Sequence, residues 1–196
     1  MSNFISAQLP TDLGIFRIYS YPQQDLYHSH VLLVHEPVNT AGIVPLRIHS
    51  ECLTGDVFSS RRCDCGFQLR KSMEYISEHG GMIIYLRQEG RGIGLHHKIE
   101  AYSLQDQGLD TIEANYQLGF AADQRTYEVA VDILQEWEVK KVSLLSNNPA
   151  KKLFLESAGI EVVRMISLQK PSDEYNERYL RTKKEKMGHL FPGDEQ

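Results

Sequence analysis

Hydrophobic and polar residues follow one another along this chain in patterns that predict strands first and then alternating helices and strands. Three apolar-rich runs at 15–19, 30–35 and 43–49 predict β-strands in the first 50 residues. Helical patterns follow at 67–79, 95–107, 126–138 and 149–158, and strand patterns at 82–87, 141–146 and 160–168. This order predicts an α+β fold, in which a single domain has a mixed β-sheet with flanking helices.

Helix-ending residue types support these boundaries. Asn148 is a favoured N-cap residue, Pro149 suits the first helical turn, and Gly159 suits the end of the same helix. The last 27 residues carry 6 acidic and 6 basic residues and few apolar ones. We therefore expect a catalytic domain over residues 1–170 and a polar, partly ordered C-terminal tail over residues 171–196.

Composition narrows the class of protein. The chain has 196 residues, of which 41% are hydrophobic and 24% charged, as in ordinary globular proteins, and its net charge is −5. A negative net charge argues against a broad basic field that would hold nucleic acid. The longest apolar run is far shorter than the ~20 residues needed to span a bilayer, and the N-terminus lacks a signal-peptide pattern. We expect a cytoplasmic protein that binds neither nucleic acid nor membrane.

All three cysteines, Cys52, Cys63 and Cys65, lie within 14 residues. An odd number argues against a disulfide framework, and clustering in a cytosolic protein favours a metal site. Thiolates suit zinc, and three protein ligands with an open fourth position are typical of catalytic zinc. Two alternatives stay open: a closed structural site completed by His49 or another histidine, and buried cysteines that bind no metal.

The residues before Cys52 suggest one further comparison. His49-Ser50-Glu51 matches half of the zinc deaminase signature, but the Pro-Cys-x-x-Cys half is absent because Cys63-Asp64-Cys65 stands instead. The deaminase interpretation is therefore weakened. Attack of an activated water on a purine ring carbon remains compatible with the site.

A glycine-rich segment, residues 89–94, connects a predicted strand to a predicted helix. Its alternating glycines do not match the dinucleotide-binding pattern, and the chain contains no P-loop. Backbone N–H groups at such a helix start can bind an anion, and Arg91 adds a bidentate phosphate donor. An exposed turn without a ligand is the alternative.

A second anion-binding corner is predicted where Ser146 and Lys151 flank the Asn-Asn-Pro helix start. A capped surface helix is the alternative here, and Asp123 and Arg125 are locally typical of surface charge. Taken together, these local patterns indicate a hydrolase with an open thiolate zinc site and a phosphorylated small-molecule substrate.

Longer stretches resemble the GTP cyclohydrolase II family over about residues 45–190. The matching stretches are RIHSECLTGD at 47–56, RCDCG at 62–66, RQEGR at 87–91, LQDQG at 104–108, EAN at 113–115, LGFAADQR at 118–125, NNP at 147–149 and KMGHL at 186–190. The combination is specific, although its single pieces are not.

This resemblance implies hydrolysis of GTP to 2,5-diamino-6-ribosylamino-4(3H)-pyrimidinone 5′-phosphate with release of formate and pyrophosphate, the first committed step of riboflavin synthesis. It implies one Zn²⁺ per chain on Cys52, Cys63 and Cys65, Mg²⁺ on the GTP triphosphate, and a homodimer. The chain length implies the stand-alone form rather than a fusion with dihydroxybutanone-phosphate synthase.

The resemblance also implies roles for individual residues. Tyr102 would assist ring opening, Arg125 would act as the nucleophile at the α-phosphate, and Asp123 would accept a proton. Arginine is effectively always protonated, so electrostatic stabilisation is the second role open to Arg125. The implied substrate-binding residues are Arg47, Ile48, His49, Ser50, Glu51, Gln68, Glu89, Gly90, Arg91, Thr111, Ser146 and Lys151.

Two other functions stay open at this point. One is a diverged paralogue that acts on a purine nucleotide but stops at the formamide, and the other is a non-enzymatic zinc module. Tyr102 argues against the first, and the acidic net charge argues against a zinc module that binds nucleic acid.

Overall fold

The computed structural model describes residues 5–21 and 29–188, apart from the side chains at 178, 186 and 187. Within these residues seven strands form one sheet in the order β1-β2-β3-β5-β4-β6-β7. The strands are β1 (Ile5–Thr11), β2 (Gly14–Tyr21), β3 (His30–His35), β4 (Ile43–Ser50), β5 (Gly81–Leu86), β6 (Lys141–Leu145) and β7 (Glu161–Ile166). The pairs β1/β2, β2/β3 and β3/β5 are antiparallel, whereas β4/β6 and β6/β7 are parallel. The predicted α+β class with a mixed sheet is confirmed.

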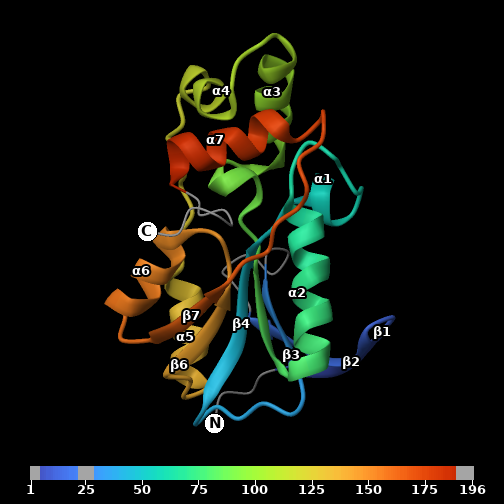
Figure 1. Cartoon of the computed structure of the whole chain (residues 1–196), viewed down its shortest axis with the longest axis vertical. Coiled ribbons are helices and arrows are strands. Elements are labelled where there is room, and N and C mark those ends of the chain that lie inside the picture. The colour runs from blue at the N-terminus through green and yellow to red at the C-terminus, as the bar shows by residue number, and fades with distance from the viewer. Residues whose placement is uncertain (1–4, 22–28, 189–196) are drawn as a thin grey trace. The chain divides into compact units, whose positions relative to one another are not determined.

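The other elements of the described chain are helices (Figure 1). They are α1 (Leu53–Asp56), α2 (Cys65–His79), the 3₁₀ turn η2 (Glu89–Gly92), α3 (Gly94–Asp106), α4 (Thr111–Gln117), α5 (Glu128–Glu136), α6 (Pro149–Ser157) and α7 (Glu177–Met187). The predicted helices are present, with ends that differ by a few residues. Elements β1, α1 and α4 were not predicted as separate elements.

The fold contains two compact units, each made of three chain segments. Counting only the described residues, the sheet unit comprises residues 5–21 and 29–49, 70–87 and 127–168, and the cysteine unit comprises residues 50–69, 88–126 and 169–188. The chain passes repeatedly from one unit to the other, so neither unit is a contiguous piece of sequence.

Alternation along β4 explains how the sheet unit places polar residues beside its core. Val44, Leu46 and Ile48 are almost fully buried in a hydrophobic cluster with α5 and α6. Each fully buried aliphatic side chain contributes roughly 1.5–3 kcal/mol to folding. Because successive strand residues face opposite sides of a sheet, Arg47 and His49 lie on the other face.

The predicted tail contains a helix where the structure describes it. Helix α7 runs through Glu177–Met187, and Asn176, Thr182 and Lys183 are buried. Residues 189–196 of the predicted tail lie outside the described residues. None of the described helices combines the length and hydropathy that crossing a membrane requires.

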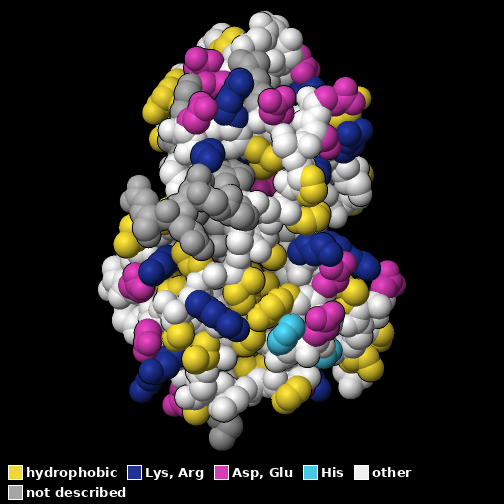
Figure 2. Space-filling view, viewed as in Figure 1, with side chains coloured by type: hydrophobic (Ala, Val, Ile, Leu, Met, Phe, Trp, Pro, Cys, Tyr) yellow, Lys and Arg dark blue, Asp and Glu magenta, His cyan; other side chains and the backbone are white. Residues whose placement is uncertain are grey.

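Charged side chains of both signs are interspersed on the face shown in Figure 2. This mixture agrees with the modest net charge of −5. Binding of an anion therefore depends on local groups of basic residues rather than on one broad basic surface.

Candidate active site

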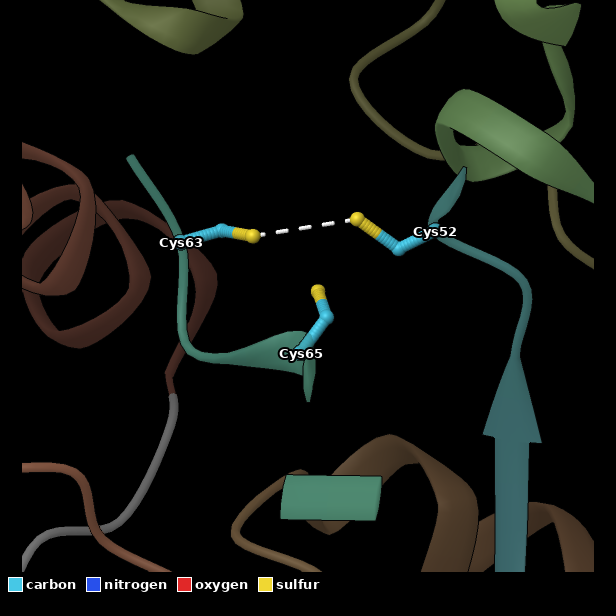
Figure 3. A group of neighbouring side chains, drawn as sticks. All are labelled: Cys52, Cys63 and Cys65. Carbon is cyan, nitrogen blue, oxygen red and sulfur yellow. Dashed lines mark hydrogen bonds between the residues drawn. The ribbon is translucent and has the colours of Figure 1, made fainter. Parts of the chain in front are cut away.

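The three cysteines come together in the cysteine unit. Cys52 precedes α1, Cys63 lies in the following loop and Cys65 begins α2, and their sulfur atoms point toward one another (Figure 3). The three Sγ atoms lie within 4.8 Å of one another, and those of Cys52 and Cys63 are 3.7 Å apart. Two sulfurs on one tetrahedral zinc, each at ~2.3 Å, are about 3.8 Å apart. The cluster therefore fits a zinc ion.

Two glycines allow the loop segments of this cluster to approach closely. A Cβ atom added to Gly55 would lie 3.0 Å from the Cys63 Sγ and 3.1 Å from the Cys52 Sγ. A Cβ atom added to Gly66 would lie 2.1 Å from the carbonyl oxygen of Gly55. A side chain at Gly66 would therefore require a backbone shift, and one at Gly55 would press on two of the three sulfur atoms, so glycine at these positions favours the close approach.

A buried lysine contacts one of the three sulfurs. Lys98 Nζ donates to Cys52 Sγ at 3.1 Å and to Glu89 Oε1 at 2.7 Å. Hydrogen bonds from the Cys63 and Cys65 thiols, and then the charge of Lys98, hold the pKa of Cys52 well below its ordinary value. The environment thus favours a thiolate at Cys52, which is the form that binds metal.

The loop between the second and third cysteines is tied to the last helix. Asp64 Oδ1 accepts a hydrogen bond from Lys183 Nζ at 2.6 Å, and Asp64 Oδ2 accepts one from Gln68 Nε2 at 2.8 Å. Lys170 Nζ donates to the carbonyl oxygen of Cys63 at 3.2 Å. Gln68, a predicted substrate-binding residue, therefore belongs to the same polar network as the cysteine loop.

Tyr102 on α3 is held beside the cysteines through Thr54. Its hydroxyl lies 3.2 Å from Thr54 Oγ1, which itself lies 3.7 Å from Cys52 Sγ. The Arg62 guanidinium stands 5.0 Å from the centre of the tyrosine ring. Burial raises the pKa of Tyr102, so its hydroxyl is protonated at neutral pH.

Asp123 and Arg125 form a bidentate ion pair elsewhere in the cysteine unit. Arg125 Nε donates to Asp123 Oδ1 at 2.8 Å, and Arg125 Nη2 donates to Asp123 Oδ2 at 2.5 Å. Burial alone would raise the pKa of Asp123, but the adjacent Arg125 outweighs it and lowers that pKa. What looked locally like surface charge is thus a defined pair whose arginine side chain is only 14% exposed.

The glycine-rich segment has an unusual backbone. Gly90 and Arg91 both have left-handed conformations, with φ of 63° and 62°, and a Cβ on Gly92 would lie 3.1 Å from the Gln124 carbonyl oxygen. Arg91 Nη1 donates to the Ala122 carbonyl at 3.4 Å, whereas its Nη2 has no hydrogen-bond partner among the described residues. A buried guanidinium nitrogen in this state is suited to an anionic ligand.

The sheet unit holds a separate group of predicted substrate-binding residues. Arg47 Nη1 donates to the Leu145 carbonyl at 2.9 Å, and Arg47 Nη2 lies 3.2 Å from His49 Nδ1. Lys151 Nζ donates to the carbonyl of Ile48 at 2.7 Å, and the Ile48 side chain is in the core. The structure therefore places the Arg47 and Lys151 side chains against backbone carbonyls of β6 and β4, respectively.

The remaining predicted substrate-binding residues lie where strands end or helices begin. Ser146 Oγ accepts from the Asn148 backbone N–H at 3.1 Å, where α6 begins. Ser50 Oγ accepts from Gln88 Nε2 at 3.4 Å. Thr111 opens α4 directly after its Asp110 N-cap. Glu51 connects β4 to Cys52.

Sequence reasoning missed Lys98 and Lys183. Lys98 lies on a correctly predicted helix but carries no local motif, and Lys183 lies in the segment predicted as a tail. A metal site completed by a histidine was the open alternative. His49 stacks on Tyr85, with 5.4 Å between the ring centres. The group of potential metal ligands among the described residues contains only cysteines.

Comparison with known proteins identifies the family. A family model described as GTP cyclohydrolase II matches residues 2–167. "GTP cyclohydrolase-2" of Picrophilus torridus is 49% identical over 189 residues, covering 96% of this chain and 98% of the relative. "GTP cyclohydrolase-2" of Actinobacillus succinogenes is 54% identical over 186 residues, covering 94% and 86%.

A longer relative matches equally well over part of its length. The "Riboflavin biosynthesis protein RibBA" of Staphylococcus saprophyticus is 51% identical over 184 residues, which are 94% of this chain and 46% of that protein. The family model covers most of the chain, and the first two relatives match it almost end to end. The chain therefore belongs to the GTP cyclohydrolase II family.

Proposed function

We propose that this chain hydrolyses GTP to 2,5-diamino-6-ribosylamino-4(3H)-pyrimidinone 5′-phosphate, with release of formate and pyrophosphate, as the first committed step of riboflavin synthesis. The observation that carries the proposal is the cluster of three cysteine sulfurs with the Tyr102 hydroxyl beside it. Family membership indicates GTP as the substrate, and the cysteine cluster offers a metal site for its hydrolysis.

Cys52, Cys63 and Cys65 would hold one zinc ion per chain. Zinc bound there would supply a Lewis acid that lowers the pKa of water toward ~7 and so provides a nucleophile at neutral pH. Three protein ligands leave a fourth coordination position, as in catalytic rather than structural zinc sites.

Tyr102 is suited to donate a proton when the imidazole ring of guanine opens. Burial keeps its hydroxyl protonated, and Thr54 holds that hydroxyl in place. A positioned acid that protonates a leaving nitrogen speeds bond cleavage by about 10²–10⁴-fold.

We propose that the GTP triphosphate binds the basic side chains among the predicted substrate-binding residues, with Mg²⁺ on its oxygen atoms. Arg91 supports this assignment because its Nη2 is buried without a partner among the described residues. For Arg125 we favour electrostatic stabilisation of the transferring phosphoryl group over covalent attack. Its bidentate pair with Asp123 keeps the guanidinium charged, and a charged guanidinium lacks a nucleophilic lone pair.

The direct test is incubation of the zinc-loaded protein with GTP and Mg²⁺, followed by measurement of formate and pyrophosphate. Equal amounts of both products support the proposal. Pyrophosphate without formate would favour the paralogue that stops at the formamide, and neither product would favour a non-enzymatic zinc module. Cys63→Ser is the matched variant, expected to lose both zinc and formate release.

Two further parts of the proposal concern the protein in the cell. We propose that it acts in the cytoplasm as a homodimer, as the family resemblance implies. Sedimentation of the purified protein at several concentrations tests the dimer.

A further inference from the structure

A chain of buried polar contacts leads from Glu89 through Lys98 to Cys52. Lys98 Nζ lies 2.7 Å from Glu89 Oε1 and 3.1 Å from Cys52 Sγ, and the Lys98 and Glu89 side chains are only 10% and 9% exposed. We infer that Lys98 and Glu89 are positioning residues that hold Cys52 for zinc. The inference rests on the proposed zinc site and adds two residues to its support.

Glu89 also holds the backbone next to this ligand. Its Oε2 accepts a hydrogen bond from the N–H of Leu53, the residue after Cys52, at 2.6 Å. The N–H of Cys52 itself donates to Asp56 Oδ2 at 3.0 Å. The Cys52 side chain and the backbone on both sides of it are thus held by specific contacts, which leaves its sulfur little freedom of orientation.

Charge explains why a lysine is suited to this position. A zinc ion with three thiolates has a net charge of about −1. A buried ammonium group against Cys52 compensates this charge, and its N–H···S contact withdraws electron density from the sulfur. Glu89 in turn pairs with Lys98, so the cation is not buried without a partner.

Glu89 thereby has a role that does not depend on substrate. Its carboxylate accepts from Lys98, from Leu53 N–H and from its neighbour Gly90 N–H at 2.7 Å. If Glu89 served GTP alone, its substitution would leave metal binding in the absence of GTP unchanged. Metal affinity without substrate therefore separates the two roles.

The test measures zinc affinity by competition with a chromophoric chelator, together with the thiolate-to-cobalt charge-transfer band of Co²⁺-substituted protein. Loss of a contact that orients a metal ligand typically weakens metal affinity 10–100-fold, and we expect about this loss for Lys98→Met. Lys98→Arg, which keeps a charged donor, should restore part of it. Lys71→Met is the control, since Lys71 is an exposed residue paired with Glu74 on α2.

Lys98→Met leaves the Glu89 carboxylate without its cation, so the double variant Lys98→Met/Glu89→Gln is the fairer comparison. We expect it to bind zinc as weakly as Lys98→Met, with a shifted cobalt band and a cooperative thermal transition. Zinc affinity equal to wild type in the double variant would overturn the inference. If Lys98→Met does not fold, the zinc affinity of Glu89→Gln is the deciding measurement. A zinc affinity equal to wild type in that variant would also overturn the inference. If the wild-type protein itself binds no zinc, the proposed function fails instead.

Discussion

Lys183 on α7 forms a buried ion pair with Asp64, the residue between Cys63 and Cys65. The Lys183 Nζ and Asp64 Oδ1 atoms are 2.6 Å apart, and the two side chains are 9% and 4% exposed. Asp64 also accepts from Gln68 at 2.8 Å. The last helix is thereby connected to the loop that carries two of the three proposed zinc ligands.

Removal of one partner from this pair should destabilise the protein. Lys183→Met leaves a buried carboxylate without its cation, which costs about 3–5 kcal/mol in comparable pairs. Urea unfolding should therefore show a lower midpoint for Lys183→Met, and a smaller loss for Lys183→Met/Asp64→Asn, which removes both charges. Lys152→Met, in an exposed pair within α6, is the control and should change stability by less than about 1 kcal/mol. Equal midpoints for Lys183→Met and the control would contradict the prediction.

The cysteine cluster was predictable because its residues lie close together in sequence. Cys52, Cys63 and Cys65 fall within 14 residues, so their count and spacing alone indicate a metal. Lys98 was not predictable, since its contact with Cys52 joins residues 46 positions apart. Local patterns describe one helix or loop at a time and do not show which distant segment packs against it.

The missed elements have different physical causes. Helix α4 has seven residues, too few to show a helical period, and is defined by the capping box of Asp110 and Glu113. Strand β1 has mostly exposed side chains, so burial produces no strong alternation, and its pairing with β2 defines it. Helix α7 lies in the segment predicted as a polar tail, and the buried ion pair of Lys183 with Asp64 attaches it to the cysteine loop.

Gly66→Ala should disturb the cysteine cluster through sterics alone. The added methyl group would lie 2.1 Å from the Gly55 carbonyl oxygen, so the backbone at Gly55 or at residue 66 must shift. We expect a destabilisation of roughly 1–3 kcal/mol and weaker zinc binding. Gly42→Ala is the control because the added methyl approaches the end of the Asn39 side chain at 3.1 Å. Thermal unfolding and chelator competition measure both effects, and unchanged zinc affinity in Gly66→Ala would count against the steric argument.

Tyr102→Phe separates the chemistry from the metal site. It removes the hydroxyl that contacts Thr54 and keeps the ring, so fold and zinc content should stay as in wild type. Formate release should fall by about 10²–10⁴-fold if the hydroxyl acts as a general acid. Tyr116→Phe, at an exposed position on α4, should keep full activity. A Tyr102→Phe protein that releases formate at the wild-type rate would exclude the proposed role.

Arg125 should govern both the turnover and the protonation of Asp123. Arg125→Ala is expected to abolish GTP turnover, whereas Arg125→Lys, which keeps the positive charge, should retain measurable activity if the role is electrostatic. A phosphorylated guanidinium adduct on the wild-type protein, detected by mass spectrometry after a GTP quench, would instead support covalent attack. Lys141→Met, in an exposed pair with Glu161 in the sheet unit, is the control for both assays.

The same variant makes a prediction about pH. In the wild-type protein, burial raises the pKa of Asp123, but Arg125 outweighs it, so the folded pKa is below its ordinary value. The ionised carboxylate therefore contributes stability above about pH 4, and this contribution is lost as the pH falls through the folded pKa. In Arg125→Ala the main lowering influence is gone, so the pKa of Asp123 should rise. Carboxyl ¹³C NMR titration of the two proteins measures the shift directly, and an unchanged Asp123 pKa would show that Arg125 does not control this carboxylate.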